Sequence, residues 1–169
     1  MIRAIAAGTA AVALVLGGGS AVAGVVTGYP HATNGFVKPV DRAWISQGFG
    51  CTVYAFEPVD PNCPGGHWHS GIDLAADRGT PVRATLGGVA TVVRSAAGYG
   101  LHVIIDHGNG LQSLYAHLDS AAVASGDPVS SGEVIGAIGS TGNSTGPHLH
   151  FELRRDGIAE DPRAEMTLP

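Results

Sequence analysis

The sequence predicts a compact all-β structure, and three observations support this prediction. Short alternating or apolar runs, which are typical of strands, recur along the chain at Leu101–Asp106, Leu111–Leu118 and His148–Glu152. Asn109-Gly110, between the first two runs, is a strong β-hairpin signal. The 169 residues include 26 glycines, and beyond the N-terminal segment no helical periodicity extends further than a turn or two.

Residues 1–23 have the three parts of a secretory signal peptide. Arg3 precedes an apolar run from Ala4 to Leu16, and the small residues Ala21-Val22-Ala23 follow. We expect cleavage after Ala23, which predicts an exported protein. An uncleaved membrane anchor is the alternative, because no Lys, Arg, Asp or Glu occurs between Arg3 and Lys38. We expect residues 24–37 to form a mobile leader, 38–162 a single domain and 163–169 a tail.

Charge and cysteine usage narrow the possible partners and compartments. The formal net charge is −5 and Lys and Arg form no run, which argues against a nucleic-acid partner. The two cysteines, Cys51 and Cys63, would pair in an oxidising compartment and close a loop of 13 residues. A role as metal ligands is the alternative, but their spacing lacks the close pairing of structural zinc sites. The loop would either form a wall of a site or only organise a surface excursion.

The remaining strands are expected in chain order between turn signals. The first candidates lie around 38–40 and 44–46, before a break at Gly48-Phe49-Gly50. Further short strands are expected at 80–82, 89–94, 101–106, 111–118, 133–139 and 148–155, with a turn at Asp156-Gly157.

The run from His148 to Glu152 is the first candidate for a site. Successive strand side chains point to opposite faces, so His148 and His150 share one face while Leu149 and Phe151 take the other. Two imidazoles side by side above an apolar layer suit a metal ion and a proton-handling group. Two surface histidines on a half-buried strand would give the same pattern.

His69 and Asp73 form the second candidate pair. Four residues of extended strand span about 13 Å, whereas two ligands of one zinc each lie about 2 Å from it. The two side chains can therefore share a metal only if the chain bends between them. Ser70-Gly71 permits a bend, because Gly accepts backbone angles that other residues avoid. We expect His67 to be a rim residue.

These pairs and His117 give five groups for one hydrolytic site. Catalytic zinc commonly has three protein ligands and one open position, which a two-histidine, one-aspartate set provides. Two uncoordinated imidazoles would then orient water and handle protons near neutral pH. Spacing alone does not say which groups are ligands. The candidates are His69, Asp73, His117, His148 and His150.

Five motifs in order resemble the lysostaphin/LytM-type zinc metallopeptidases. They cover essentially the whole predicted domain, from about Lys38 to Pro162. The motifs are His69-Ser-Gly-Ile-Asp73 with Gly79-Thr-Pro-Val82, Ile105–Gly110, Leu114-Tyr-Ala-His-Leu118, Gly139-Ser-Thr-Gly142, and Ser144–Glu152 (STGPHLHFE).

The resemblance implies a small antiparallel sheet or open β-sandwich with a narrow groove over one zinc ion per chain. It assigns His69, Asp73 and His150 as zinc ligands, and His117 and His148 as the histidines that flank the zinc water. Either of these two could be the general base. The implied activity is hydrolysis of peptide bonds in the stem or cross-bridge of peptidoglycan. From the predicted signal peptide we expect the chain to be secreted or cell-wall associated, and we expect it to be a monomer. The alternatives are a non-catalytic regulator of cell-wall amidases and a zinc peptidase that acts on non-wall peptides.

Three further features are not among the predicted site residues. The loop between Cys51 and Cys63 is an elaboration that could narrow the groove and change specificity. We expect His102 to lie at the surface and His107 to be a structural residue of the hairpin turn.

Overall fold

The computed structural model describes residues 35–168, so the predicted signal peptide and nearly all of the predicted leader lie outside the described residues. Within this range the chain forms thirteen strands and one short 3₁₀ turn, η1 (Pro162–Ala164). The described part contains no helix long and apolar enough to cross a membrane. The predicted all-β fold is confirmed.

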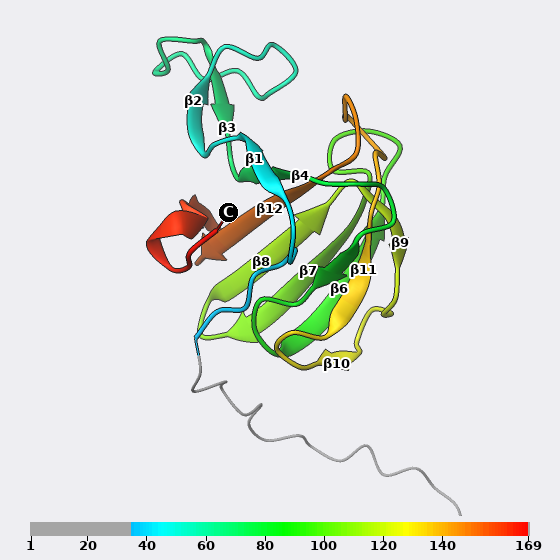
Figure 1. Ribbon diagram of the computed structural model, residues 1–169. Helices are drawn as coiled ribbons and strands as arrows, with labels where there is room; N and C mark the ends of the chain where they lie inside the picture. The colour runs from blue at the N-terminus through cyan, green and yellow to red at the C-terminus, as the bar shows by residue number, and fades with distance from the viewer. Residues whose placement is uncertain (1–34, 169) are drawn as a thin grey trace, which may run out of the picture.

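The main sheet has eight antiparallel strands and carries most of the candidate residues (Figure 1). Its central strands β12, β8 and β7 are neighbours, and β7 and β8 form the hairpin predicted at Asn109-Gly110. Asn109 has a φ of 52°, the left-handed conformation that such turns require. Along the sheet the order is β1 (Trp44–Gln47), β4 (Ile72–Ala75), β12 (His148–Arg155), β8 (Leu111–Ala116), β7 (Leu101–Gly108), β6 (Gly88–Arg94) and β10 (Pro128–Val129), and β13 (Ile158–Glu160) pairs with β12.

A second sheet of three strands completes an open sandwich. It consists of β5 (Pro81–Arg83), β11 (Val134–Ile138) and β9 (Leu118–Ala121), with β11 in the middle. Ile135 and Ile138 of this sheet belong to the same buried cluster as Tyr115 and Phe151 of the main sheet. The apolar side chains of the two sheets therefore form one core. Because the apolar face of β12 packs into this core, the opposite face of β12 is turned toward the candidate site.

A two-stranded ribbon projects beyond the main sheet at the top of Figure 1. It pairs β2 (Gly50–Thr52) with β3 (His67–His69), and a long loop connects the two strands. A disulfide joins Cys51 to Cys63 with their Cα atoms 5.2 Å apart, so the predicted pairing is confirmed. The ribbon brings His69 to the edge of the main sheet.

Three expectations of the sequence analysis were wrong in detail. Residues 38–40 form no strand, although Val40 is buried in the core. His102 is buried rather than exposed, and its Nδ1 contacts the carbonyl oxygen of Gly100 at 3.0 Å. His107 lies within β7 and is buried, with Nε2 2.8 Å from the Ser113 hydroxyl, so it belongs to a buried polar network and not to the turn.

Candidate metal centre

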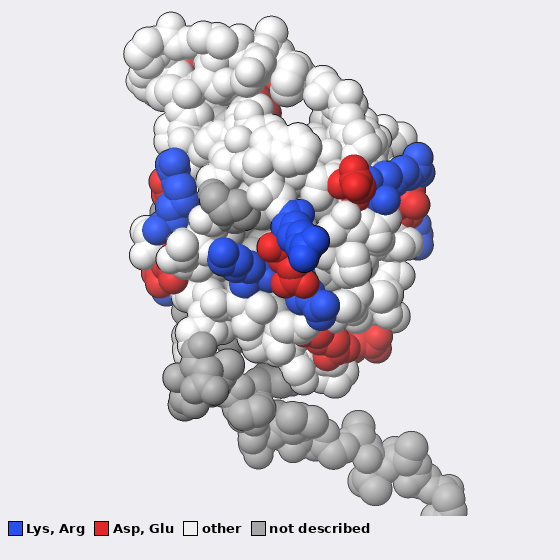
Figure 2. All heavy atoms as spheres, in the orientation of Figure 1, with Lys and Arg blue, Asp and Glu red and all other residues white. Residues whose placement is uncertain are grey.

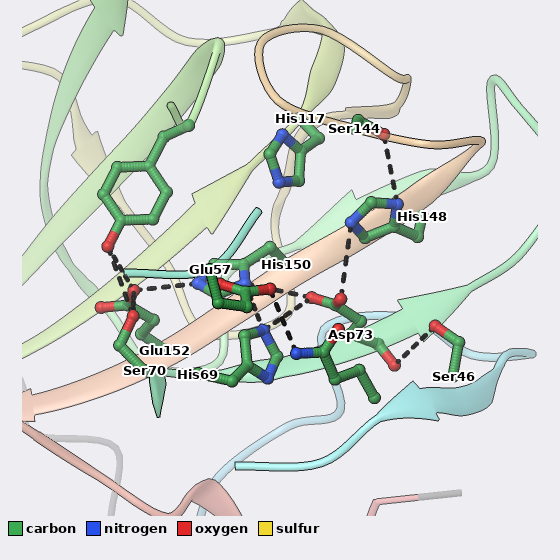
Figure 3. Close-up of polar contacts among 12 residues, drawn as sticks. Ser46, Glu57, His69, Ser70, Asp73, His117, Ser144, His148, His150 and Glu152 are labelled. Carbon is green, nitrogen blue, oxygen red and sulfur yellow. Dashed lines mark hydrogen bonds and ion pairs between the residues drawn. The ribbon is translucent and has the colours of Figure 1, made fainter. Parts of the chain in front are cut away.

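Strand register brings three of the candidate side chains together. Asp73 on β4 stands directly opposite His150 on β12, and β3 delivers His69 from the projecting ribbon (Figure 3). His69 Nε2 lies 2.9 Å from His150 Nδ1 and 3.2 Å from Asp73 Oδ1, and His150 Nδ1 lies 3.0 Å from Asp73 Oδ1. All three residues are buried. Three potential ligand atoms therefore converge on one point.

The predicted bend between His69 and Asp73 is present, but the reason that it needs a glycine differs from the one expected. The chain bends at Gly71 between β3 and β4. Gly71 has no left-handed φ; instead, a Cβ at this position would lie 2.5 Å from the carbonyl oxygen of Phe151 and 2.9 Å from His150 Cε1. Glycine is needed because β12 passes so close, and not for backbone freedom.

The hydrogen bonds made by the outer ring nitrogens of His69 and His150 determine which nitrogen of each ring faces the centre. His69 Nδ1 lies 2.8 Å from the carbonyl oxygen of Gly48, which can only accept, so this nitrogen carries the proton. His150 Nε2 lies 2.9 Å from Glu152 Oε1, a carboxylate acceptor. In their neutral forms both rings therefore turn a lone pair toward the Asp73 carboxylate. Three acceptors face one another with no donor between them, so the centre requires a cation.

The pKa shifts of His150 and Asp73 also favour a positive charge at the centre. Burial alone lowers the pKa of His150, but its contacts with Asp73 and Glu152 outweigh burial and raise the pKa to about 9. Burial alone raises the pKa of Asp73, yet its contacts with His150 and His69 hold that pKa well below the ordinary 3.8. Without a metal, a proton on His150 supplies the positive charge.

The donor set fits zinc. Two imidazole nitrogens and one carboxylate oxygen are the ligand types of catalytic zinc sites, which keep a further position open. Each imidazole is oriented from behind by a carbonyl or carboxylate acceptor, as is usual for metal-binding histidines.

The other two candidate histidines flank this centre. The rings of His117 and His148 lie 4.7 Å apart between centroids, and His117 lies 5.9 Å from the ring of His150. His148 Nδ1 contacts the carbonyl oxygen of Gly146 at 2.8 Å, and its Nε2 lies 3.7 Å from Asp73 Oδ2. The structure thus brings all five predicted residues to one place.

His117 is held in a conformation that few residues adopt. Its φ is 60°, in the left-handed region, at the junction of β8 and β9. Its Nδ1 donates to the carbonyl oxygen of Thr141 at 2.8 Å, and no described residue hydrogen-bonds to Nε2. Burial lowers the pKa of His117 to about 4, and the Thr141 contact only partly offsets this. The ring is therefore neutral at pH 7, with an acceptor nitrogen available to a ligand.

Glu152 contacts the centre through His150, and the sequence analysis assigned Glu152 no role. It is fully buried, and it accepts hydrogen bonds from the nearby Arg154 and from Ser70 and Tyr99, which are distant in sequence. Its Oε1 accepts from Ser70 Oγ at 2.6 Å and Tyr99 Oη at 2.6 Å, and its Oε2 accepts from Arg154 Nε at 2.6 Å. Burial alone would raise the pKa of Glu152, but His150 and the other partners lower it to about 2. The residue therefore presents a carboxylate to His150.

The position of Glu152 beside His150 could have been predicted from the alternation of side chains along the strand. Residues 148, 150 and 152 share one face of β12, so an acidic residue two positions after His150 falls beside it. Tyr99 gave no comparable signal, because it reaches Glu152 from a loop 53 positions away in sequence.

The centre opens into a groove of about 790 Å³. One wall comes from the loop closed by the disulfide, including Tyr54, Phe56 and Glu57. Opposite parts of the lining include Tyr99, from the loop after β6, and Asn143 and Thr145, from the loop before β12. His117, His148 and His150 also line the groove, so a bound ligand can reach them.

A buried two-histidine, one-aspartate centre beside two further histidines in an open groove defines a mononuclear metallohydrolase-type site. The chain belongs to peptidase family M23, whose family model matches residues 67–162.

Named relatives agree with this assignment. The chain is 46% identical over 135 residues to DD-carboxypeptidase/endopeptidase Mpg of Neisseria meningitidis serogroup B, covering 79% of this chain and 29% of that protein. It is 45% identical over 116 residues to peptidoglycan DD-endopeptidase ShyA of Vibrio cholerae, covering 68% of this chain and 26% of that protein. The chain spans less than a third of the length of these relatives.

Solved structures share the fold. A zinc-containing peptidase from Vibrio cholerae matches with a TM-score of 0.64 and 34% identity, covering 80% of this chain and 41% of that one. The catalytic domain of lysostaphin from Staphylococcus simulans matches with a TM-score of 0.59 and 33% identity, covering 72% of this chain and 90% of that one. The resemblance drawn from the five motifs is confirmed.

Proposed function

We propose that this chain is a zinc-dependent endopeptidase that hydrolyses peptide bonds in the stem or cross-bridge of peptidoglycan. The convergence of three potential ligand atoms on one point, beside two further histidines that line an open groove, carries this proposal. The names of the relatives Mpg and ShyA support the substrate class, since both refer to DD-endopeptidases and one to peptidoglycan.

In the proposed mechanism, His69, Asp73 and His150 hold the metal. Zinc in such a site polarises a carbonyl oxygen and lowers the pKa of water toward neutrality. The hydrogen bonds to Gly48 and Glu152 fix the two rings, so their lone pairs stay directed at the metal position.

His117 and His148 handle protons and orient the substrate. In each ring Nδ1 donates to a backbone carbonyl, of Thr141 or Gly146, which leaves Nε2 available; in His148 this atom lies 3.7 Å from Asp73 Oδ2, beside the centre. A neutral Nε2 accepts a proton from water, and a protonated one donates a hydrogen bond to developing negative charge or to the leaving amine. Either ring can serve as the base, and the other then stabilises the oxyanion.

The experiment compares wild type with Asp73→Ala on purified peptidoglycan. Asp73 is the carboxylate of the proposed centre, so the variant should lose bound zinc and turnover together. Asp161→Ala, at the cap of η1 and not among the groove-lining residues, is the control and should keep both. Full turnover by Asp73→Ala, or by wild type freed of metal, would contradict the proposal.

We further propose that residues 1–23 export the chain and that it acts outside the cytoplasm as a monomer. The disulfide between Cys51 and Cys63 supports an oxidising compartment. The mass of the protein recovered from the culture medium or wall fraction tests this. Cleavage after Ala23 supports a secreted form, whereas the full-length mass in the membrane fraction supports the anchored alternative.

A further inference from the structure

The loop between Cys51 and Cys63 forms a rigid wall of the groove. The disulfide closes its base, Trp68 N donates to the carbonyl oxygen of Pro58 at 2.9 Å, and His67 Nδ1 contacts the carbonyl oxygen of Glu57 at 2.7 Å. These contacts hold the backbone at Glu57 and Pro58 against β3, so the loop stays beside the groove.

The wall exposes aromatic surface to the groove. Tyr54 is 47% exposed and Phe56 is 52% exposed, and both line the groove. Their rings stack, with centroids 5.5 Å apart and planes inclined by 17°. Large exposed aromatic side chains in a pocket are typical of ligand contacts, because covering them removes apolar surface from water.

The same wall carries an unpaired negative charge. Glu57 is half buried and lines the groove, and its only described side-chain hydrogen bond is from Gln47 Nε2 at 3.1 Å. No described Lys, Arg or His pairs with the Glu57 carboxylate, and the described lining of the groove contains no Lys or Arg. Asp73 is the other carboxylate in this lining, and it would be a ligand of the proposed metal. Among the described lining residues, Glu57 is therefore the carboxylate without a cationic partner.

The surrounding surface does not neutralise this charge. Residues 51–63 include Glu57 and Asp60 but no Lys or Arg. In Figure 2 the blue Lys and Arg side chains lie on the body of the molecule, and none is seen on the projecting ribbon and its loop. An anion beside stacked aromatic rings favours a ligand with a cationic head and an aliphatic stem.

We propose that Tyr54, Phe56 and Glu57 form a specificity subsite for a peptide residue that carries a free amino group. Glu57 would bind the ammonium group, while the two rings would cover the aliphatic chain. A diamino acid residue of a stem peptide has this chemistry, whereas a glycine cross-bridge does not. The inference rests on the proposed peptidase function, because it takes the groove to be the substrate site.

Binding to the metal-free chain tests the subsite without cleavage. The probes are the pentapeptide L-alanyl-γ-D-glutamyl-L-lysyl-D-alanyl-D-alanine and the same peptide acetylated on the lysine amino group, titrated calorimetrically into the chelator-treated chain. We expect the free amine to bind about fivefold more tightly, the upper end for a partly exposed ion pair. The preference should shrink at 1 M salt, where the screening length falls to about 3 Å.

The decisive variant is Glu57→Gln, which keeps an acceptor for Gln47 and removes only the charge. It should bind both peptides equally, while Glu133→Gln, a matched change at an exposed turn outside the groove, should keep the preference. Equal binding of both peptides by wild type, a preference retained by Glu57→Gln, or no binding of either peptide at millimolar concentration would overturn the subsite.

Two further arms separate the alternatives. A glycan fragment without peptide is titrated as well. If its affinity depends on Tyr54 and Phe56, and the lysine amino group of the pentapeptide has no effect on peptide binding, the wall binds sugar and the proposal is overturned. Restoring zinc and assaying hydrolysis of the same peptides tests the activity separately. An amine preference in binding without any hydrolysis would support the subsite and contradict the proposed peptidase.

Discussion

Glu152→Gln offers a direct test of how the proposed centre is organised. Glu152 contacts His150 Nε2 at 2.9 Å and is fully buried, so it fixes the ring whose other nitrogen faces the metal position. Loss of an outer partner of this kind typically costs 10–100-fold in metal affinity, or about 1.4 to 2.7 kcal/mol. The Gln amide retains one acceptor oxygen, but its NH₂ group would face Arg154 Nε, a second donor.

The assay is competition for zinc with a chromophoric chelator. Tyr99→Phe is a milder companion, because it removes one of the donors that hold Glu152 and should weaken zinc binding by less. Glu160→Gln, at an exposed pair with Arg155, is the matched control. Denaturation of each metal-free variant separates loss of zinc binding from loss of folding. Zinc affinity of well-folded Glu152→Gln within twofold of wild type would refute the positioning role.

Gly71→Ala should lower stability by about 1–3 kcal/mol, measured by urea denaturation, because its methyl group would meet the β12 backbone. His117→Asn, which tolerates the left-handed backbone, should keep zinc but lose at least about 100-fold in kcat; unchanged kcat would remove His117 from the mechanism. Replacing Cys51 and Cys63 together by serine should lower the free energy of unfolding by about 3 kcal/mol, and no change would show that the loop is fixed by other contacts. Burial lowers the pKa of His107. The free energy of unfolding of the wild type, measured in chelator, should therefore fall relative to that of His107→Gln as the pH drops below about 6.5. Parallel pH profiles of the two proteins would contradict this.

The sign of the His107 effect follows from proton uptake. The unfolded chain binds a proton near the ordinary histidine pKa, whereas the buried ring does so only at lower pH. Between these two pKa values the unfolded state holds more protons, so stability rises with pH and falls on acidification. The Asp106 charge opposes burial but does not reverse the direction of the pKa shift.

Strand period made the candidate centre predictable from sequence. Alternation in His148–Glu152 correctly separated the histidine face from the apolar face, since Leu149 and Phe151 are fully buried. The requirement for a bend between His69 and Asp73 also held, because ligand distance limits the geometry whatever the fold. These inferences succeed because they depend on local chain geometry.

The remaining features depend on which segments become neighbours. The close approach of β12 that makes glycine necessary at position 71 cannot be read from the local sequence. Burial of His107 likewise depends on its neighbours, because a carbonyl oxygen of Gly87 and the Ser113 hydroxyl on β8 are the partners that make a buried imidazole tolerable. The same holds for Tyr99, whose partner Glu152 lies on a distant strand.

Zinc-dependent cleavage of peptidoglycan peptides at the convergent centre is the proposed activity. The most direct measurement is digestion of purified peptidoglycan by the chain before chelation, after chelation and after return of one equivalent of zinc, with the released fragments identified by mass. We expect release of cross-link fragments that stops on chelation and returns with zinc. Undiminished release after removal of the metal, or no release by a chain that holds one zinc, would contradict it.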